Sequence, residues 1–588
     1  MTDADVIVVG AGHNGLTAGS YLARAGLKVL VVEASDKVGG MTSTNPVLSN
    51  APGHLVNEGA MDSSLWRTAS IARDLHLETR FGLREVEVDP AYAFLDPDGS
   101  SLCIHRDPVR TADEIARFSK PDAAAYLELV NALEAAMNVS VPFMNTNPMR
   151  PSLGGITGMS RGALKSALHP MRMGPLAHFF TASHAGFVEE RFRDRRIRAL
   201  LAALPCFAPM FEDGTAWVLI YFGLIHRAGV GRFIGGTGAV TDALARCYAA
   251  HGGQVRTNSV VSEFVVRDGA VCGVRLEDGR ELTAPRVITT NNVKVPLTEW
   301  LPDGILPDHL AERATRIPTS STHASSFKVD VALGGRAQLS AHVREDGVDL
   351  RKPAICYTTF EEHVQAWRDC ARGQVPDPLP GIAILPTGVD PSQAPDGQDT
   401  FWFWSGISPV HPTEPWSELA GPLAERVLGT ASKYFDGLTE LEIDRQVMTP
   451  PLIEQRFRAP DGNVYHVDPT ATRFGPLRPA AGFAGFRSPV PGLFLSGGGT
   501  HPSAGICGVP GQQAAAAVLR DRRGGGIGGG VGAVAGKAKK SVKKLRRAAV
   551  RARGSSSPPG SSSAPSGTSS GTSSGNPNSG STDGEGRE

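Results

Sequence analysis

Val6-Ile-Val-Val-Gly10-Ala-Gly12-His-Asn-Gly15 is the stretch of sequence that decides the fold. Its β-branched run predicts a buried strand, and helical spacing from Leu16 to Ala25 predicts a helix after the glycines. A second β-branched run, Val29 to Val32, completes a predicted strand–helix–strand unit. Glycines spaced Gly-x-Gly-x-x-Gly between strand and helix permit a tight turn, close approach of backbone to a pyrophosphate, and close packing of helix on strand. The stretch therefore predicts an α/β fold with a dinucleotide site.

The predicted dinucleotide contacts begin at this turn, because the free N–H groups and positive end of a helix favour a bound pyrophosphate. Glu33 stands at the end of the second predicted strand, where a carboxylate can accept hydrogen bonds from an adenosine ribose. The residues assigned to the turn and helix start are Gly10, Gly12, His13, Asn14 and Gly15.

A glycine pair after Glu33 favours FAD over NAD as the dinucleotide. Gly39 and Gly40, followed by Met41, lie where the backbone must pass close to the rest of a long dinucleotide. The sequence contains one credible dinucleotide turn, so we expect no separate NAD(P)H domain. Electrons would then pass to oxygen, to a quinone or back to a product.

A second glycine-rich segment, Gly492 to Gly511, predicts another wall of the same site. A strand there breaks into glycines and restarts as the helix Gln512 to Leu519, which would present N–H groups to a cofactor. His501 is the candidate for a polar, catalytic role in this segment. The cofactor contacts assigned to the segment are Gly498, Gly499, Thr500 and Gly505.

These motifs together resemble those of the phytoene desaturase-related flavoproteins, a family that includes carotenoid desaturases, a β-carotene ketolase type and pyridine nucleotide-disulfide oxidoreductase domain-containing proteins. The resemblance implies a glutathione-reductase-type FAD-binding Rossmann domain with an inserted mixed α+β substrate domain. It also implies that Gly39, Gly40 and Met41 lie beside the flavin and that Val261 contacts the adenine. The segments that carry it are Val6 to Thr44, Gly235 to Ala245, Val255 to Asn291 and Gly462 to Ala517.

The predicted domains are discontinuous along the chain. Residues 1–80, 230–300 and 455–522 are assigned to FAD binding, and residues 81–229 and 301–454 to the substrate domain. Hairpin signals at Asp268-Gly269 and Asp278-Gly279 predict a β-meander that leads back into a sheet. Strand patterns at Ser326 to Leu333 and Thr400 to Trp404 belong to the substrate domain. Residues 523–588, which are rich in Gly, then in basic residues, then in Ser, predict a disordered tail.

Composition and charge restrict the class of protein. The 59 basic and 59 acidic side chains give no net charge, which argues against a dedicated nucleic-acid binder. The seven cysteines include no Cys-x-x-Cys pair, and His169, His178 and His184 have no acidic partners at ligand spacing, so no metal is predicted. A cytoplasmic location is expected. The basic segment from Lys537 to Arg553 suits either a solvated tail or peripheral contact with the inner membrane surface.

The expected activity is desaturation of an apolar polyene or prenyl lipid by hydride transfer to flavin N5, with carotenoid biosynthesis suggested by family analogy. Ketolation, double-bond isomerisation and amine oxidation remain open on the same fold, as does an FAD-bound regulatory protein. Gly158-Met-Ser160-Arg-Gly162 matches a hydrolase motif, but no predicted strand precedes it. Side chains expected to line a substrate tunnel are Met171, Met173, Phe179, Phe180, Phe207, Met210, Phe211 and those of Trp217 to Ile225.

Overall fold

A computed structural model describes residues 2–168, 174–204, 208–470 and 472–523. The predicted tail beyond residue 523 lies outside these residues. Two large sheets organise the described chain. One contains five strands and the other seven.

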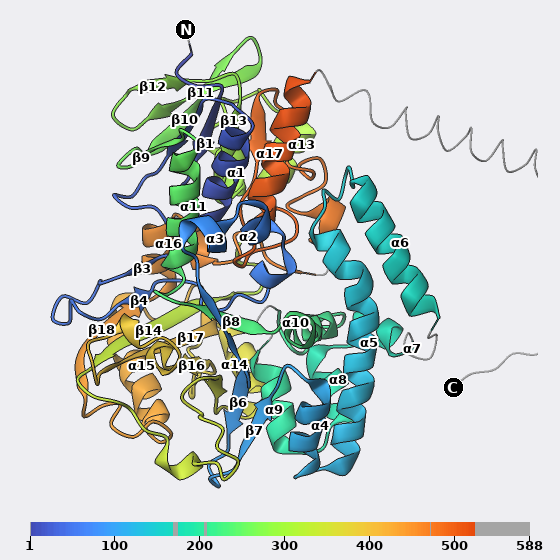
Figure 1. Cartoon of the computed structure of the whole chain (residues 1–588), viewed down its shortest axis with the longest axis vertical. Helices are drawn as coiled ribbons and strands as arrows, with labels where there is room; N and C mark the ends of the chain where they lie inside the picture. Colours follow the sequence, from blue (N-terminus) through green and yellow to red (C-terminus); the bar gives the residue numbers. More distant parts are fainter. Residues whose placement is uncertain (1, 169–173, 205–207, 471, 524–588) are drawn as a thin grey trace, which may run out of the picture. The chain divides into compact units, whose positions relative to one another are not determined.

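The five-stranded sheet is parallel and is assembled from segments far apart in the sequence. Its order is β19-β13-β1-β2-β9. β1 and β2 occupy the predicted runs, and the predicted helix begins earlier than expected, at His13, because Gly12 serves as its N-cap. Helix α1 contacts both α11 and α17, which lie beside it (Figure 1). The bounds are β1 Val6–Val9, α1 His13–Arg24, β2 Val29–Val32, α11 Gly238–Ala250, β9 Gln254–Arg256, β13 Val287–Thr289, β19 Leu493–Leu495 and α17 Val509–Arg522.

Alternation along β1 divides its side chains between two cores. Val6 and Val8 pack with α1 and α17 in one cluster, whereas Ile7 and Val9 pack in another with the meander strands. This is the alternation expected of a strand buried on both faces. The central position of β1 fixes the glycine turn at the carboxyl edge of the sheet, where ligands bind in open α/β folds.

The predicted meander is present and has one strand more than predicted. Strands β10 Val261–Arg267, β11 Ala270–Leu276 and β12 Glu281–Thr283 form an antiparallel sheet. Asp268 and Gly269 both adopt positive φ, 51° and 72°, as a two-residue type I′ hairpin turn requires. The chain then enters β13 of the parallel sheet, which corresponds to the predicted strand Arg286 to Thr290.

The seven-stranded sheet has the order β18-β14-β17-β16-β15-β6-β7. All neighbours are antiparallel except β6 and β15. The predicted strands Ser326 to Leu333 and Thr400 to Trp404 are the central parts of its two long strands, β14 and β17. The bounds are β6 Tyr92–Leu95, β7 Ser101–Ile104, β14 Ala324–Leu333, β15 Ala354–Cys356, β16 Ile382–Ile384, β17 Asp399–Pro409 and β18 Glu442–Met448.

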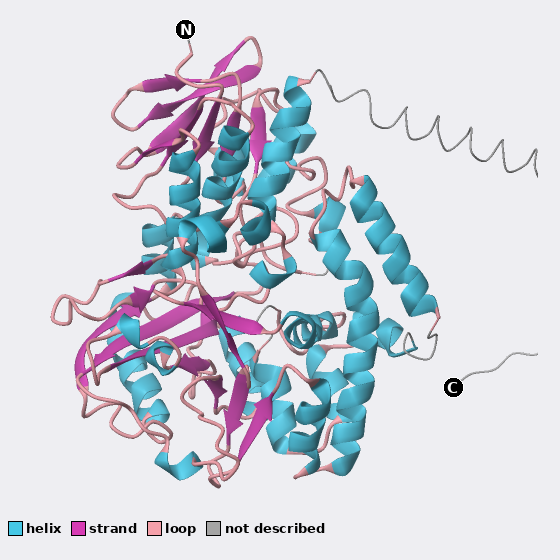
Figure 2. Ribbon diagram, viewed as in Figure 1, coloured by secondary structure: helices cyan, strands magenta, loops and turns pink. Residues whose placement is uncertain are grey.

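Helices cover the larger sheet on both faces. One face packs against α15 Trp416–Ala431, and the other packs against a helical layer that Figure 2 shows in cyan. Within the described residues, no helix has the length and apolar character needed to cross a membrane. The helices of the layer are α4 Pro108–Ala116, α5 Lys120–Met144, α8 His184–Arg191, α9 Arg195–Ala203, α10 Ile220–Ala228 and α14 Phe360–Ala371, with α6 Leu153–Ala167 and α7 Gly174–Thr181 packed on α5.

The hydrolase-like motif lies inside α6 and is explained by helix packing. A Cβ on Gly162 would lie 2.0 Å from the carbonyl oxygen of Asn138 on α5. Glycine is therefore required there for the two helices to approach each other. The element that precedes α6 is the helix α5 rather than a strand, so Ser160 does not occupy a nucleophile elbow.

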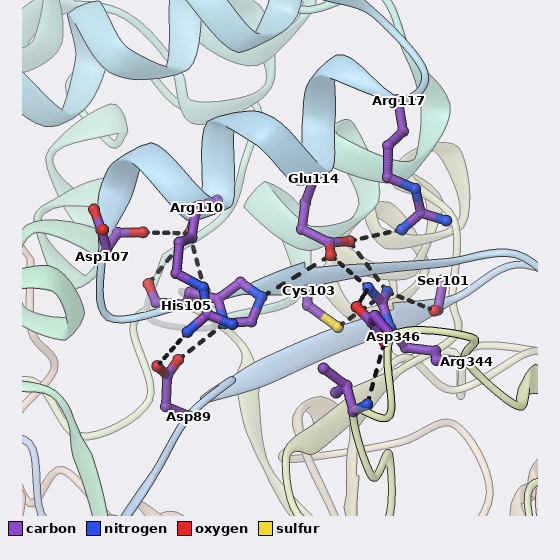
Figure 3. A network of polar contacts seen from close by, with 12 residues as sticks. Asp89, Ser101, Cys103, His105, Asp107, Arg110, Glu114, Arg117, Arg344 and Asp346 are labelled. Carbon is purple, nitrogen blue, oxygen red and sulfur yellow. Dashed lines mark hydrogen bonds and ion pairs between the residues drawn. The ribbon is translucent and has the colours of Figure 1, made fainter.

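An ion-pair network ties α4 to the strands below it (Figure 3). Arg344 donates to Glu114 Oε2 on α4 at 3.1 Å, and also bonds Asp346. His105, which follows β7, lies 3.1 Å from Asp89 through its Nδ1. Burial raises the pKa of the neighbouring Cys103 thiol to about 12, so this sulfur stays protonated. The network fixes the edge of the larger sheet.

A two-stranded ribbon joins segments that the sequence assigned to different domains. Strand β5 Glu85–Val88 pairs with β8 Val230–Phe233. The exact domain limits along the chain stay a prediction. The remaining short elements are β3 Thr44–Asn45, β4 Val56–Asn57, α2 Ile71–Asp74, α3 Leu77–Phe81, α12 Lys294–Thr298, α13 Asp308–Thr315 and α16 Pro450–Phe457.

Candidate active site

A cavity of about 390 Å³ lies among the elements described above. Its walls include the glycine turn after β1 as well as side chains of β6, β14, β16 and β17 in the larger sheet. A ligand bound at the turn therefore has access to the same cavity as a ligand held against the larger sheet.

The glycine turn has the close packing that a pyrophosphate site needs. Gly10 adopts a φ of +100°, and a Cβ on Gly15 would lie 1.9 Å from the carbonyl oxygen of Gly10. Helix α1, which is described over its whole length, has no side-chain cap at Gly12 and no acidic residue in its first turn. Its first N–H groups and its positive end are thus left for an anion. Gly10, Gly12, His13 and Asn14 all line the cavity.

The glycine pair passes directly against this turn. The amide of Gly39 donates to the carbonyl of Ala11 at 3.0 Å, and Gly39 and Gly40 have φ values of +133° and +56°. Both glycines and Met41 line the cavity. Their arrangement leaves a cradle of backbone for an extended dinucleotide.

Glu33 is placed for a ribose contact. Its Oε2 accepts a hydrogen bond from the amide of Ala11 at 2.7 Å, and its Oε1 accepts one from the amide of Ser35 at 2.9 Å. A carboxylate with two oxygens has further acceptor capacity for a diol. Glu33 and Val261 both line the cavity.

The C-terminal glycine segment contributes fewer direct contacts than predicted. Gly498 and Gly505 line the cavity, and Gly505 has a φ of +117°. Gly499 and Thr500 do not line it. Thr500 instead donates its hydroxyl to the carbonyl of Gly497 at 2.9 Å, which stabilises the turn.

His501 also stands away from the cavity, which removes the basis for assigning it a catalytic role. Its Nε2 lies 3.0 Å from the carbonyl oxygen of Phe143 at the end of α5, and its ring packs edge-on against the Phe143 ring. The side chain is only 2% exposed. Burial lowers its pKa to about 4, so the imidazole is neutral. The environment of His501 is that of a packing residue.

Arg478 holds this wall from behind. Its fully buried guanidinium donates to the carbonyls of Val467 and Gly498 at 3.0 and 2.8 Å, and also to those of Tyr465 and Thr500. Burial lowers its pKa to about 9. One side chain therefore fixes both the segment around His466 and the glycine segment.

Two cavity-lining imidazoles have unused hydrogen-bonding nitrogens. His13 Nδ1 lies 2.9 Å from Thr42 Oγ1, while His13 Nε2 and His466 Nδ1 are buried without a hydrogen-bond partner in the described part of the chain. Burial lowers both pKa values to about 4. These neutral rings are available to a bound ligand, and buried polar atoms normally find such partners.

The part of the cavity formed by the larger sheet is aromatic and aliphatic, with buried charge. Trp402 and Trp404 of β17 and Ile384 of β16 supply apolar surface. Lys328 of β14 lies over the Trp402 ring, 5.7 Å from its centroid, and forms an ion pair with Asp330. Burial raises the pKa of Asp330 to about 6 and lowers that of Lys328.

A second polar cluster lines the same part. Tyr92 donates to Asp62 Oδ2 at 2.9 Å, Tyr221 donates to the same oxygen, and the two hydroxyls are 3.0 Å apart. Burial, with Asp62 nearby, raises the pKa of both tyrosines well above the usual value. Both hydroxyls remain protonated at neutral pH.

The set of side chains expected to form an apolar tunnel is largely wrong. Tyr221 lines the cavity, but Phe179 and Met210 belong to the core, and Phe180 and Phe211 are exposed. Met171, Met173 and Phe207 lie outside the described residues. Hydrophobicity alone does not separate core packing from a cavity wall.

Sequence reasoning missed Lys328, Asp330 and the Asp62–Tyr92–Tyr221 cluster. A signal existed for the first two, because a lysine and an aspartate two residues apart interrupt an otherwise apolar strand and point to one face. No local signal marks the cluster, since its members come from three distant segments.

Among the described residues, no group of three or more metal-ligating side chains comes together. His184 is buried, with Nε2 2.9 Å from the carbonyl of Leu201. His178 has an acidic neighbour that the sequence did not indicate, Glu190 at 3.6 Å. His169 lies outside the described residues.

The parallel sheet, the glycine cradle and Glu33 define an FAD-dependent oxidoreductase. Residues 15–382 match the family model of the flavin containing amine oxidoreductases, and the chain belongs to this family. The predicted fold class, the relationship to phytoene desaturase-related flavoproteins and the cofactor FAD are confirmed.

Relatives match nearly the whole folded region. The chain is 28% identical to mouse pyridine nucleotide-disulfide oxidoreductase domain-containing protein 2, over 88% of this chain and 93% of the relative. It is 25% identical to a limonene dehydrogenase polypeptide of Castellaniella defragrans, over 89% and 95%. It is also 25% identical to the neurosporene-forming phytoene desaturase of Cereibacter sphaeroides, over 88% and 95%.

Solved structures share the fold. Cyclohexylamine oxidase from Brevibacterium oxydans aligns with a TM-score of 0.54 and 18% identity, covering 89% of this chain and 100% of that one. An oxidoreductase from Methanosarcina mazei aligns with a TM-score of 0.53 and 15% identity, covering 88% and 99%.

Proposed function

We propose that the protein is an FAD-dependent desaturase of an apolar, polyene- or prenyl-like substrate. The observation that carries the proposal is the cavity itself, in which the dinucleotide cradle and the apolar wall formed by Trp402, Trp404 and Ile384 face a common space. The relatives named limonene dehydrogenase and phytoene desaturase support this choice.

The chemistry requires loss of two hydrogens from neighbouring carbons. FAD, when bound, accepts one of them as a hydride with its electron pair. The second leaves as a proton, and the carbon–carbon double bond forms from the electrons of its broken C–H bond. The protein orients the substrate between apolar side chains and excludes water.

Lys328 and Asp330 are proposed to take up that proton. Burial brings their pKa values towards each other, since it lowers that of Lys328 and raises that of Asp330 to about 6. Such a pair can exchange a proton near neutral pH. Lys328 lines the cavity, and Asp330 lies behind it on the same strand face.

The proposal is tested by mixing the FAD-loaded protein anaerobically with candidate apolar substrates. Bleaching of the flavin absorbance together with a product lighter by two hydrogens is the expected result. A product that gains oxygen would indicate a ketolase, and an isomer of unchanged mass would indicate an isomerase. Absence of bleaching with every polyene and prenyl substrate would contradict the desaturase assignment.

Amine oxidation is the second candidate, and Asp62 favours it. A carboxylate in an otherwise apolar cavity can attract an ammonium group, and the family and its solved members include amine oxidases. The same anaerobic assay separates the two, because an amine substrate would yield an imine that hydrolyses to a carbonyl product.

The electron acceptor is proposed to be oxygen or a quinone. Mixing the reduced protein with aerated buffer or with a soluble quinone measures each rate directly. A faster reaction with the quinone would place the protein near a membrane. Deleting residues 524–588 and repeating a liposome flotation assay tests whether the basic tail contributes, and unchanged flotation would exclude that role.

A further inference from the structure

Arg232 is a buried arginine with no carboxylate partner in the described part of the chain, and its side chain lines the cavity. It lies on β8 and is only 5% exposed. Its Nε is buried without a hydrogen-bond partner, and its Nη1 makes a long hydrogen bond of 3.4 Å to the carbonyl of Gly231. Among the described residues, no acidic side chain forms an ion pair with it.

The acidic residues of the neighbouring strand are committed to other arginines. Glu85 and Glu87 of β5 lie 3.2 and 2.9 Å from Arg67, and Glu87 also lies 2.9 Å from Arg106. The residue paired with Arg232 in the ribbon is Val86, so its side chain cannot neutralise the guanidinium.

The carboxylate of Asp62, on the same cavity wall, is also engaged. Its Oδ2 accepts from Tyr92 and Tyr221, and its Oδ1 accepts from the amide of Ser64 at 3.3 Å. Arg232 lies near enough to Tyr92 to influence it electrostatically. The wall therefore carries one saturated carboxylate and one guanidinium with free donor capacity.

A buried, unpaired guanidinium is costly, and guanidinium groups bind planar oxygen anions with two parallel hydrogen bonds. An anion that arrives with the substrate would supply the missing partner. We propose that Arg232 binds a carboxylate on the substrate, so that the substrate class is an apolar acid, with its hydrocarbon body against the tryptophans. This inference rests on the proposed function, in that it takes the cavity to be the substrate site.

The test measures binding rather than turnover. The FAD-loaded protein is dialysed to equilibrium against labelled oleate, against its methyl ester and against oleyl alcohol, which share one hydrocarbon body. Oleate is expected to bind at least about tenfold more tightly than the two neutral probes, because charge-assisted hydrogen bonds favour the acid. Equal affinity for the three probes would overturn the inference.

Arg232→Met provides the second comparison. It is expected to weaken oleate binding by about 10- to 100-fold and to leave binding of the methyl ester unchanged. Arg232→Lys, which keeps the charge but loses the planar fork, should give an intermediate loss. Arg84→Met is the matched control, because Arg84 is exposed beside the same ribbon.

FAD content and the melting temperature of each variant establish that it is folded. If Arg232→Met does not fold, the preference of the unmodified protein for acid over ester still decides the question. A folded Arg232→Met variant that binds oleate as tightly as the unmodified protein would contradict the role of Arg232. Failure of the flavin to bleach would instead concern the desaturase proposal, since the dialysis needs no reaction.

Discussion

Glu33 Oε2 lies 2.7 Å from the backbone nitrogen of Ala11, which donates a hydrogen bond to it. This bond joins the end of β2 to the glycine turn after β1. The carboxylate therefore shapes the turn and also lines the cavity, where its remaining lone pairs face the ribose site. Loss of Glu33 is expected to affect the turn and the cofactor together.

Glu33→Ala should weaken FAD binding by about 10- to 100-fold, because it removes charged hydrogen bonds each worth about 1.5–3 kcal/mol. The measurement is a fluorescence titration of the apoprotein with FAD. Glu414→Ala, at an exposed position, is the matched control and should leave FAD affinity unchanged. Tight FAD binding by Glu33→Ala would show that the ribose is held elsewhere.

Gly15→Ala should lower the melting temperature and abolish stable FAD binding. A Cβ at this position would lie 1.9 Å from the carbonyl oxygen of Gly10, so α1 must move away from β1. Such overpacking costs about 1–3 kcal/mol. Thermal unfolding and the ratio of FAD to protein after gel filtration measure the two effects.

Gly429→Ala is the control for this glycine. Gly429 is exposed in α15, and a Cβ there would meet no atom within 4 Å. Its replacement is expected to raise stability by about 0.5–1 kcal/mol, as for alanine in a helix interior. Similar destabilisation by both substitutions would contradict the packing argument.

The sequence predicted the cofactor half of the site well, because that half is built from local patterns. The turn from Gly10 to Gly15, Glu33 and the Gly39–Gly40 pair each lie next to a strand that fixes their position. His501 was misjudged because its environment depends on Phe143, which α5 brings from a distant part of the chain. Local spacing carries no information on such a contact.

The substrate half was not predictable for the same reason. Asp62, Tyr92 and Tyr221 meet only when β6 and α10 pack against the loop after β4. The partnerless state of Arg232 among the described residues depends on which arginines the glutamates of β5 bind. These are outcomes of tertiary packing rather than of any periodicity in the sequence.

Stability and FAD retention should fall as the pH decreases from about 6.5 towards about 4. Burial lowers the pKa of His13 and His466 from 6.5 to about 4 in the folded protein. The unfolded chain binds protons in this window and the folded one does not, so the stability contribution is complete above pH 6.5 and is lost on acidification. Melting temperature against pH measures it.

His466→Gln should reduce the number of protons taken up on unfolding near pH 5 by about one. The slope of stability against pH is then shallower over the same window. His309→Gln, at an exposed position, is the control and should retain the original slope. An unchanged slope in His466→Gln would mean that this imidazole is already protonated in the folded state.

The ion pair between Lys328 and Asp330 should show strong coupling in a double-mutant cycle. Lys328→Met alone leaves a buried carboxylate without its partner and should destabilise the fold by about 3–5 kcal/mol. The double variant Lys328→Met with Asp330→Leu should recover most of that loss, because well-packed apolar side chains can replace a buried pair. Chemical denaturation of the FAD-loaded proteins gives each free energy of unfolding.

Lys165→Met supplies the surface comparison for this cycle. Lys165 and Glu134 form an ion pair of 3.3 Å with side chains 60% and 44% exposed. Its loss should change stability by less than about 1 kcal/mol. If Lys328→Met were equally mild, the Asp330 carboxylate would already be protonated in the fold, and the pair could not serve as the proposed proton acceptor.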